Sequence, residues 1–205
     1  MNKPISSIKK GRKFDQVLDG ARTVFMRNGF EATGVDDIAR EAGVSKATLY
    51  SYFPDKRMLF IEAASRECLR VTQGHLETAD LTRPPSEVLP EAGRKILKFL
   101  LSDVGQNIFR IGVTESGRFP ELARKFYESG PKLMRDTLGL YLRAATERGE
   151  LVINDVDLAA EQFAELCKVH LHPCCLLGLK EQPTEAEIDR VIDGAVDMFL
   201  ARYGV

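Results

Sequence analysis

Apolar residues recur along the chain with the period of an α-helix, and no segment shows the alternation that is typical of a β-strand. The first helix has one apolar stripe, formed by Phe14, Val17, Leu18, Ala21, Val24 and Phe25. We expect it to end at Asn28-Gly29, because glycine readily adopts the left-handed conformation that closes a helix. The pattern as a whole predicts an all-α fold.

Three more helices are predicted before residue 80. The second is short and follows Thr33, whose side chain is expected to cap its free amides. Gly43 then breaks the chain, and Ser45 is expected to cap a third helix. A long fourth helix opens at Pro54-Asp55. The predicted buried positions of the second helix are Val35, Ile38, Ala39 and Ala42.

A breaker cluster at residues 82–86 predicts a loop, and helices follow it to the end of the chain. The predicted stretches are 92–100, 108–111, 121–148 with a break at Gly130-Pro131, 155 or 157 toward 178, and 184–199. The apolar stripe of the first of these is Ala92, Ile96, Phe99 and Leu100. Pro173 predicts a kink, and Thr184 with Glu187 forms a capping box.

Charge is distributed unevenly, although 29 Lys and Arg against 30 Asp and Glu give a formal net charge of -1. Residues 1–56 hold 10 basic and 7 acidic side chains, a net of +3. Five cations precede the first acid, Asp15; they are Lys3, Lys9, Lys10, Arg12 and Lys13. This asymmetry indicates either an N-terminal module that faces a polyanion or a solvated basic tail without a partner.

Composition narrows the class of protein. With 44% hydrophobic and 29% charged residues, the chain is neither a disordered tail, nor a fibre, nor a membrane bundle. No apolar run approaches the roughly 18 residues that a spanning helix needs. No apolar segment follows the basic N-terminus as it would in a secretion signal. We therefore predict a cytoplasmic protein that makes no membrane contact.

Two short helices joined by a glycine turn have the spacing of a helix-turn-helix. Counting Val35 as the first position, Ala39 is fifth, Gly43 ninth, Val44 tenth and Leu49 fifteenth. Ala39 is expected to be small because the helices cross there, and Gly43 to permit the turn. An ordinary helical hairpin gives the same bare spacing, so the flanking residues decide between the two.

The flanking residues carry a resemblance to a known family. They are Ala21, Phe25, Asn28-Gly29-Phe30-Glu31-Ala32-Thr33, Ala42-Gly43-Val44-Ser45-Lys46, Thr48-Leu49-Tyr50 and Tyr52-Phe53-Pro54-Asp55-Lys56. Over residues 12–60 the chain resembles the TetR-type (AcrR-like) transcriptional regulators, and residues 115–123 and 148–151 resemble their regulatory domain. Gly34, where such proteins often carry Ser or Thr, and Ala47, often Gly, depart from the pattern.

The resemblance implies a DNA-binding head at residues 1–56 whose third helix enters the major groove of a palindromic operator. The expected contact residues are Thr33, Gly34, Ser45, Lys46, Ala47, Thr48, Tyr50, Tyr52 and Lys56. Lys46 is expected to reach a guanine edge or a phosphate, and Thr33 and Lys56 to clamp the DNA backbone. For Tyr52, packing against the first helix is the alternative.

The resemblance also implies a dimerising, effector-binding body at residues 57–205 and a regulator, a repressor, that a small apolar or amphipathic effector releases from DNA. The expected interface between the two copies of the homodimer consists of Leu166, Leu171, Val191, Ile192, Ala195 and Phe199. The middle helices carry more large apolar side chains than one buried stripe on each helix requires, which predicts an effector pocket. A solid core without a pocket is the alternative. These pocket residues are Phe99, Phe109, Phe126, Met134, Tyr141 and Phe163.

Other residues are compatible with two alternative functions. Cys167, His170 and Cys174 share one face of a continuous helix and would permit a metal- or thiol-responsive regulator, but they match no recognised ligand spacing, and packing between helices explains them better. A helical adaptor that binds only proteins is a further alternative. Glu115 and Glu121 near Arg118 indicate a solvated helix end. No catalytic group, cofactor or metal site is expected.

Overall fold

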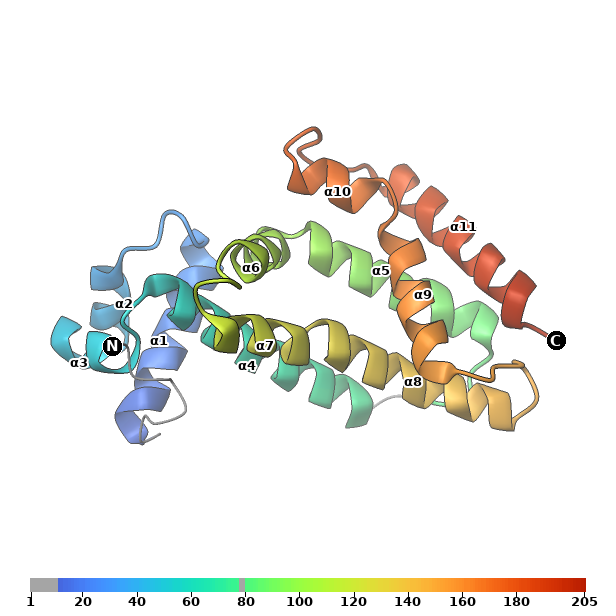
Figure 1. Ribbon diagram of the computed structural model, residues 1–205, viewed down its shortest axis with the longest axis horizontal. Helices are drawn as coiled ribbons and strands as arrows, with labels where there is room; N and C mark the ends of the chain where they lie inside the picture. Colours follow the sequence, from blue (N-terminus) through green and yellow to red (C-terminus); the bar gives the residue numbers. More distant parts are fainter. Residues whose placement is uncertain (1–10, 78–79) are drawn as a thin grey trace. The chain divides into compact units, whose positions relative to one another are not determined.

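The computed structural model describes residues 11–77 and 80–205, and these are folded as helices joined by short loops (Figure 1). Within this part of the chain, the one β-type pairing is an isolated antiparallel bridge between Leu151 and Gly204. The predicted all-α fold is confirmed. None of the described helices combines the length and the apolar character needed to cross a bilayer.

The chain divides into two compact units, which do not follow the order of the sequence. The first unit comprises residues up to Val71 together with Asn107–Pro131, and the second comprises Thr72–Gln106 and Lys132–Val205. The boundary between these two units is not at residue 56. The boundary predicted there, between a DNA-binding head and an effector-binding body, therefore stays a prediction.

The first unit contains α1 (Arg12–Asn28), α2 (Val35–Glu41), α3 (Lys46–Tyr52), the first part of α4 (Lys56–Glu77), the last part of α6 (Asp103–Thr114), and α7 (Pro120–Ser129). Every residue of the predicted stripe on α1 is buried. Gly29 closes the helix with a φ of 75°, as predicted. Phe25, Phe30 and Phe60 form an aromatic cluster with ring centroids 4.9 to 6.0 Å apart. The start of α4 is thereby fixed on α1 (Figure 1).

The crossing of α1 and α2 depends on a residue that the sequence pattern did not mark. A Cβ atom placed on Gly20 would lie 2.7 Å from the Cβ of Ala42, so only glycine fits at this position of α1. The predicted capping of α2 by Thr33 is wrong. Gly34 is the N-cap residue and makes no side-chain cap, whereas the Thr33 hydroxyl donates a hydrogen bond to the Gly29 carbonyl oxygen at 2.5 Å.

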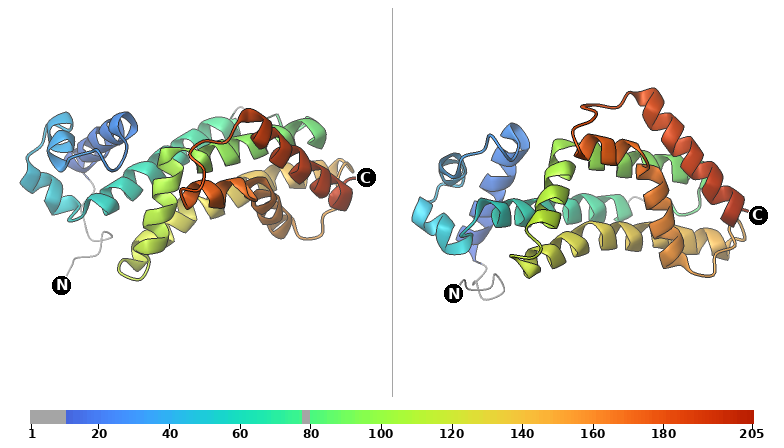
Figure 2. Two further views of the ribbon diagram at one scale, coloured as in Figure 1. Left: turned by 90° about the horizontal axis from the view of Figure 1, so that it is seen from above. Right: turned by 45° about the horizontal axis from the view of Figure 1, so that its top comes forward.

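The second unit is built from α5 (Pro85–Leu101), α8 (Pro131–Glu147), α9 (Val156–Lys168), α10 (Leu171–Leu176) and α11 (Glu185–Tyr203). Helices α5, α9 and α11 pack on one another (Figure 2), and Phe163 and Phe199 meet at the centre of their shared core with ring centroids 5.3 Å apart. The predicted Thr184/Glu187 capping box is present at the start of α11. The predicted stripe of α5 is only partly right: Ala92 packs against the core, but the fully buried positions include Leu89, Gly93 and Leu97, and Phe99 is 40% exposed.

The predicted helix from residue 155 toward 178 is two helices. It breaks at Val169-His170, where His170 has a φ of 64°, and not at Pro173. Pro173 lies in the first turn of α10, a position where the missing N–H costs no intrahelical hydrogen bond. Cys167, His170 and Cys174 therefore do not share one helical face.

Candidate nucleic-acid interface

Helix α3 presents one face to solvent and one to the protein. Leu49 and the following Phe53 are buried, whereas Lys46, Ala47 and Tyr50 are exposed. Ser45 caps the helix as predicted, accepting a hydrogen bond from the Thr48 amide at 3.1 Å. The capped N-terminal turn therefore holds a row of small or polar side chains in a fixed orientation.

The turn between α2 and α3 has the geometry that a helix-turn-helix requires. Gly43 has a φ of 63°, which residues with a Cβ rarely adopt, and the Val44 amide donates a hydrogen bond to the Ala39 carbonyl at 3.0 Å. Ile38 and Ala39 are buried on the inner side of α2. Because both turn and core are fixed, α2 and α3 form one rigid support for the exposed face.

Lys46, the cation on this face, is paired within the protein. Its Nζ lies 2.5 Å from Oδ1 of Asp36 in the first turn of α2, and both side chains are more than half exposed. An exposed ion pair of this kind contributes about 0 to 1 kcal/mol. A stronger acceptor can therefore replace Asp36 as the partner of the Lys46 ammonium group.

Thr33 and Lys56, predicted as a clamp on the DNA backbone, lie on the inner side of the loop that precedes α2. Thr33 is 2% exposed. Lys56 Nζ donates hydrogen bonds to the carbonyl oxygens of Phe30 at 2.8 Å and Thr33 at 3.1 Å, and it lies 4.3 Å from the centre of the Phe30 ring. These contacts tie the loop to the start of α4. The Thr33 side chain is too deeply buried for its hydroxyl to contact a phosphate. The expectation that Thr33 clamps the DNA backbone is therefore wrong.

The two tyrosines differ. Tyr50 is 48% exposed, whereas Tyr52 packs edge-on against Phe14 of α1 with ring centroids 5.7 Å apart. Tyr52 therefore packs against the first helix, which was the alternative to a DNA contact.

Two family descriptions match the chain. Residues 17–63 match "Bacterial regulatory proteins, tetR family", and residues 87–205 match "AefR-like transcriptional repressor, C-terminal domain", which alone covers more than half of the chain. The chain belongs to the TetR family of transcriptional regulators. Its members are DNA-binding proteins and not enzymes, so the helix-turn-helix described above is a DNA-binding element.

Similarity to individual TetR-family proteins extends over most of the chain. A regulator from Mesorhizobium loti superimposes with a TM-score of 0.76 at 26% identity, over 97% of this chain and 100% of that one. The Flavonoid-responsive Regulator FrrA has a TM-score of 0.69 at 39% identity, over 95% and 98% of the two chains. YfiR, an uncharacterized regulator of Bacillus subtilis, is 34% identical over 73 residues, which are 34% of this chain and 36% of YfiR. The chain thus matches about a third of that curated relative's length.

An arginine that sequence patterns do not mark joins the head of this TetR-family chain to the turn that follows α6. Asp55 caps α4 by accepting a hydrogen bond from the Arg57 amide at 2.8 Å. The Arg57 guanidinium lies 2.6 Å from Asp55 and 2.5 Å from Glu115, and its hydrogen bond holds the pKa of Asp55 below the usual range. Glu115, read from sequence as part of a solvated helix end, has a side chain only 13% exposed and is half of an ion pair.

The predicted effector residues of this TetR-family chain do not line one pocket within either unit. Phe109 and Phe126 pack edge-on in the first unit at 6.0 Å, where Gly112 leaves room for the Phe126 ring. Tyr141 and Phe163 belong to the core of the second unit, and Met134 is half-buried there. Phe99 is the most exposed of the set.

The predicted dimer residues are corrected by the same core. Leu171, Val191, Ile192, Ala195 and Phe199 are each at most 7% exposed, and all five pack inside the second unit. A side chain buried by its own chain cannot form the contact with a partner. Leu166 remains half-buried at the edge of this core.

The cysteines of the second unit are separated by burial. Cys167 is fully buried, and burial raises the pKa of its thiol to about 12. Cys174 is half-buried, with its Sγ 3.8 Å from Nδ1 of His170. Among the described residues, no three His, Cys, Asp or Glu side chains are grouped closely enough to hold a metal ion.

Proposed function

We propose that this TetR-family chain is a homodimeric repressor that binds a palindromic operator and releases it when a small aromatic effector binds. The observation that carries the proposal is the 39% identity to the Flavonoid-responsive Regulator FrrA over 95% of the chain. The description of the family that matches residues 87–205, an AefR-like transcriptional repressor, supports the direction of control.

In this proposal the exposed face of α3 lies in the major groove. Ser45, Thr48 and Tyr50 supply hydroxyl groups, Ala47 offers a methyl group to thymine, and Lys46 exchanges Asp36 for a guanine edge or a phosphate. Tyr52 and Lys56 support this face through their contacts inside the protein. Gly34, the N-cap residue of α2, offers its backbone to the DNA. The expected contacts are therefore concentrated in α3.

The decisive DNA experiment compares Lys46→Ala with a matched control. Selection from random duplexes with the purified protein first yields its operator. Loss of a specific base contact should then weaken operator binding by about 1 to 3 kcal/mol in Lys46→Ala. Lys95→Ala, which removes an exposed cation from the second unit, should bind as the wild type does. Equal operator affinity in all three proteins would refute the placement of α3.

Dimerisation requires apolar surface outside the core of the second unit. We infer that the outward faces of α9 and α11 supply it, because Leu158 and Met198 are 48% and 63% exposed, and Gly194 leaves open space for a close approach. Met198→Glu should lower the sedimentation coefficient to that of a monomer while helix content stays unchanged. Val191→Glu, at a position 7% exposed, should unfold the second unit instead. A folded dimeric Met198→Glu protein would rule out this interface.

The effector is proposed to belong to the flavonoid class, which is apolar and amphipathic as the sequence predicts. An effector must bind the DNA-free state about 10⁴-fold more tightly to invert a 99:1 population. A flavonoid panel should therefore raise the melting temperature and release the operator at the same concentrations. Phe126→Ala should abolish both effects, whereas Tyr127→Ala, at the exposed neighbouring position of α7, should preserve them. Stabilisation without operator release would refute induction.

A thiol-responsive regulator is the second candidate, because Cys174 lies against His170. It predicts operator release by a low-molecular-weight disulfide in the wild type and none in Cys174→Ser. Release by flavonoids in Cys174→Ser would exclude this candidate as the mode of induction.

A further inference from the structure

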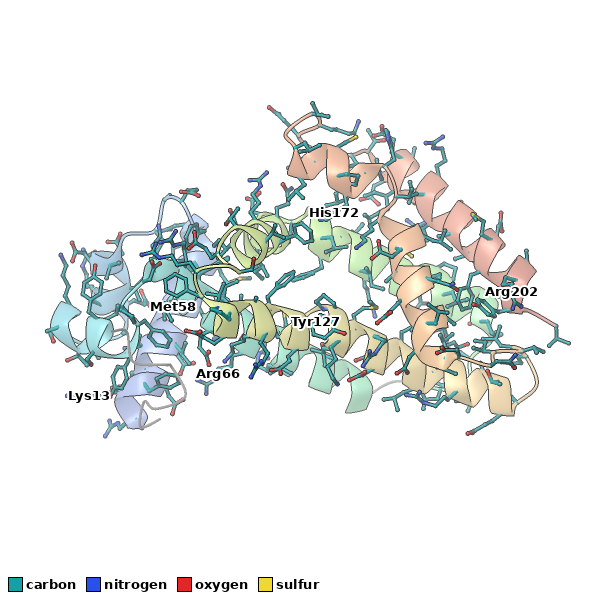
Figure 3. The ribbon with its side chains drawn as sticks, viewed as in Figure 1. Lys13, Met58, Arg66, Tyr127, His172 and Arg202 are labelled. Atoms are coloured by element: carbon teal, nitrogen blue, oxygen red, sulfur yellow. The ribbon has the colours of Figure 1, made fainter. Side chains whose placement is uncertain are left out.

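The three acidic side chains of α2 have different partners, and one of these partners belongs to α3. Asp37 pairs with Arg40 of its own helix at 3.2 Å, and Glu41 pairs with an arginine of α1 at 3.5 Å. Asp36 instead pairs with Lys46 of α3, at 2.5 Å. Both helices lie at the surface of the first unit, and side chains on their outer faces extend into solvent (Figure 3). Asp36 is thus the acid of α2 that holds a side chain of α3.

Lys46 is the only charged residue of α3, whose sequence is KATLYSY. It is the first residue of the helix, and the side chains of Lys46 and Asp36 are both more than half exposed. DNA can therefore reach this ion pair from solvent. The contact that Lys46 makes with DNA decides whether the charge of α3 serves base readout or a general attraction to any duplex.

Guanine and phosphate differ in how they tolerate the Asp36 carboxylate. A lysine ammonium group has three N–H donors, so it can serve two acceptors at once. The guanine edge in the major groove offers O6 and N7, which are uncharged acceptors. Lys46 can therefore donate to guanine while it remains beside Asp36. A phosphate in contact with Lys46 would instead share one cation with a second anion, and repulsion between the two anions opposes that contact.

The carboxylate cannot follow the ammonium group to relieve this repulsion. The Asp36 side chain has two rotatable bonds, and its backbone lies in the first turn of α2, where the Ile38 amide donates a hydrogen bond to the Gly34 carbonyl at 3.3 Å. The Lys46 side chain has four rotatable bonds and moves more freely. Because phosphates follow one another along every duplex, the repulsion acts on unrelated DNA as well as on the operator, whereas a guanine in register is found only in the operator.

We propose that Asp36 is a specificity-determining residue of the DNA-binding head. It is a positioning residue that acts through Lys46, directing the ammonium group to guanine and away from phosphate. The inference deepens the proposed function and rests on it, because α3 must lie in the major groove. Specificity is gained here by weakening the binding of unrelated sequences, through a repulsive element built into the protein.

The test measures affinity for two duplexes of equal length, the operator obtained by selection and a scrambled version of it. The wild type is compared with Asp36→Asn, which keeps the size of the side chain and one acceptor oxygen, with Lys46→Ala, and with the double variant. Asp37→Asn is the matched control, because it removes one charge from the same turn of α2 and frees Arg40 instead of Lys46. Helix content and melting temperature confirm that each variant is folded.

Asp36→Asn should lower the ratio of operator to scrambled affinity by about fivefold or more, which is the lower end of what one base contact supplies. On the scrambled duplex, its slope of log affinity against log salt should be steeper by about 0.9 for each protomer, since Lys46 then contacts a phosphate. Asp37→Asn should raise both affinities by the same factor and keep the ratio within about twofold. In the Lys46→Ala background, Asp36→Asn should leave the ratio unchanged.

A wild-type ratio in Asp36→Asn would overturn this inference, and so would an equal fall of the ratio in Asp37→Asn, which would reveal a general effect of charge. A fall of the same size with and without Lys46 would show that Asp36 does not act through Lys46. In each of these cases the proposed function stands if Lys46→Ala alone lowers the ratio. A wild-type ratio in Lys46→Ala would refute the placement of α3, and this inference with it.

Discussion

The contact between α1 and the end of α2 at Gly20 determines how α3 is supported. A Cβ atom at position 20 would lie 2.7, 2.8 and 2.9 Å from Cβ, N and Cα of Ala42. Two of these are backbone atoms, which cannot rotate away. Gly20→Ala can be accommodated only if α2, and α3 with it, moves away from α1.

Two opposing effects decide the magnitude for Gly20→Ala. Replacing glycine in a helix interior favours the folded state by about 1 kcal/mol. Overpacking of a well-packed core costs about 1 to 3 kcal/mol, and three contacts below 3.0 Å place this site at the upper end. We therefore expect a net loss of about 1 to 2 kcal/mol, which is about 5- to 30-fold in the folding equilibrium.

Hydrogen exchange of peptides from α1 and α2 measures this loss in the head alone, and operator titration measures the displacement of α3. Gly139→Ala is the matched control. Its new Cβ would meet only the guanidinium of Arg143, 3.2 Å away at the end of a flexible side chain. That variant should gain up to about 1 kcal/mol from helix propensity. Slower exchange and full operator affinity in Gly20→Ala would show that the helices are not in contact at Gly20.

Two further predictions concern the second unit. Ile192→Ala, at a fully buried position of α11, should lower the free energy of unfolding by about 2 to 5 kcal/mol in denaturant titration, whereas Leu179→Ala, 76% exposed, should leave it within experimental error. The Lys180 ammonium and the Thr184 amide and hydroxyl lower the pKa of Glu187 to about 2. Because the folded pKa is depressed, Glu187 stabilises α11 above about pH 4.5, and this contribution disappears toward pH 2. Glu187→Gln should therefore melt earlier than the wild type at pH 6 and equally at pH 2; an equal difference at both pH values would contradict this assignment.

Local chemistry made much of the fold predictable. The α1 stripe, the Gly29 and Gly43 turns and the Ser45 cap each depend on residues fewer than about 15 apart, within the reach of a sequence pattern. Thr184 and Glu187 are only three residues apart and form the predicted box. Features of this range are fixed by backbone geometry, which does not depend on what packs against the helix.

Features that depend on distant partners were missed or misassigned. The apolar face of α11 was assigned to a second copy, but a stripe does not specify what buries it, and α5 and α9 of the same chain do so. Arg57 and Glu115 are 58 residues apart, and nothing local marks them as a pair. The role of Gly20 likewise depends on Ala42, the residue that ends α2.

In the complex that we propose, base readout and phosphate contact are made by different residues of this head. The exposed face of α3 consists mainly of uncharged side chains, and its Lys46 is already neutralised by Asp36. Transfer of Lys46 to a guanine gives up about 0 to 1 kcal/mol of an exposed pair and gains about 1 to 3 kcal/mol of discrimination. Base readout therefore remains favourable without adding net charge to the complex. In the proposed complex we expect counterion release from exposed cations for which no ion pair is recorded in the described head, which are Arg12 and Lys13. Salt should consequently weaken operator and unrelated DNA in parallel, and the ratio of the two affinities should change little.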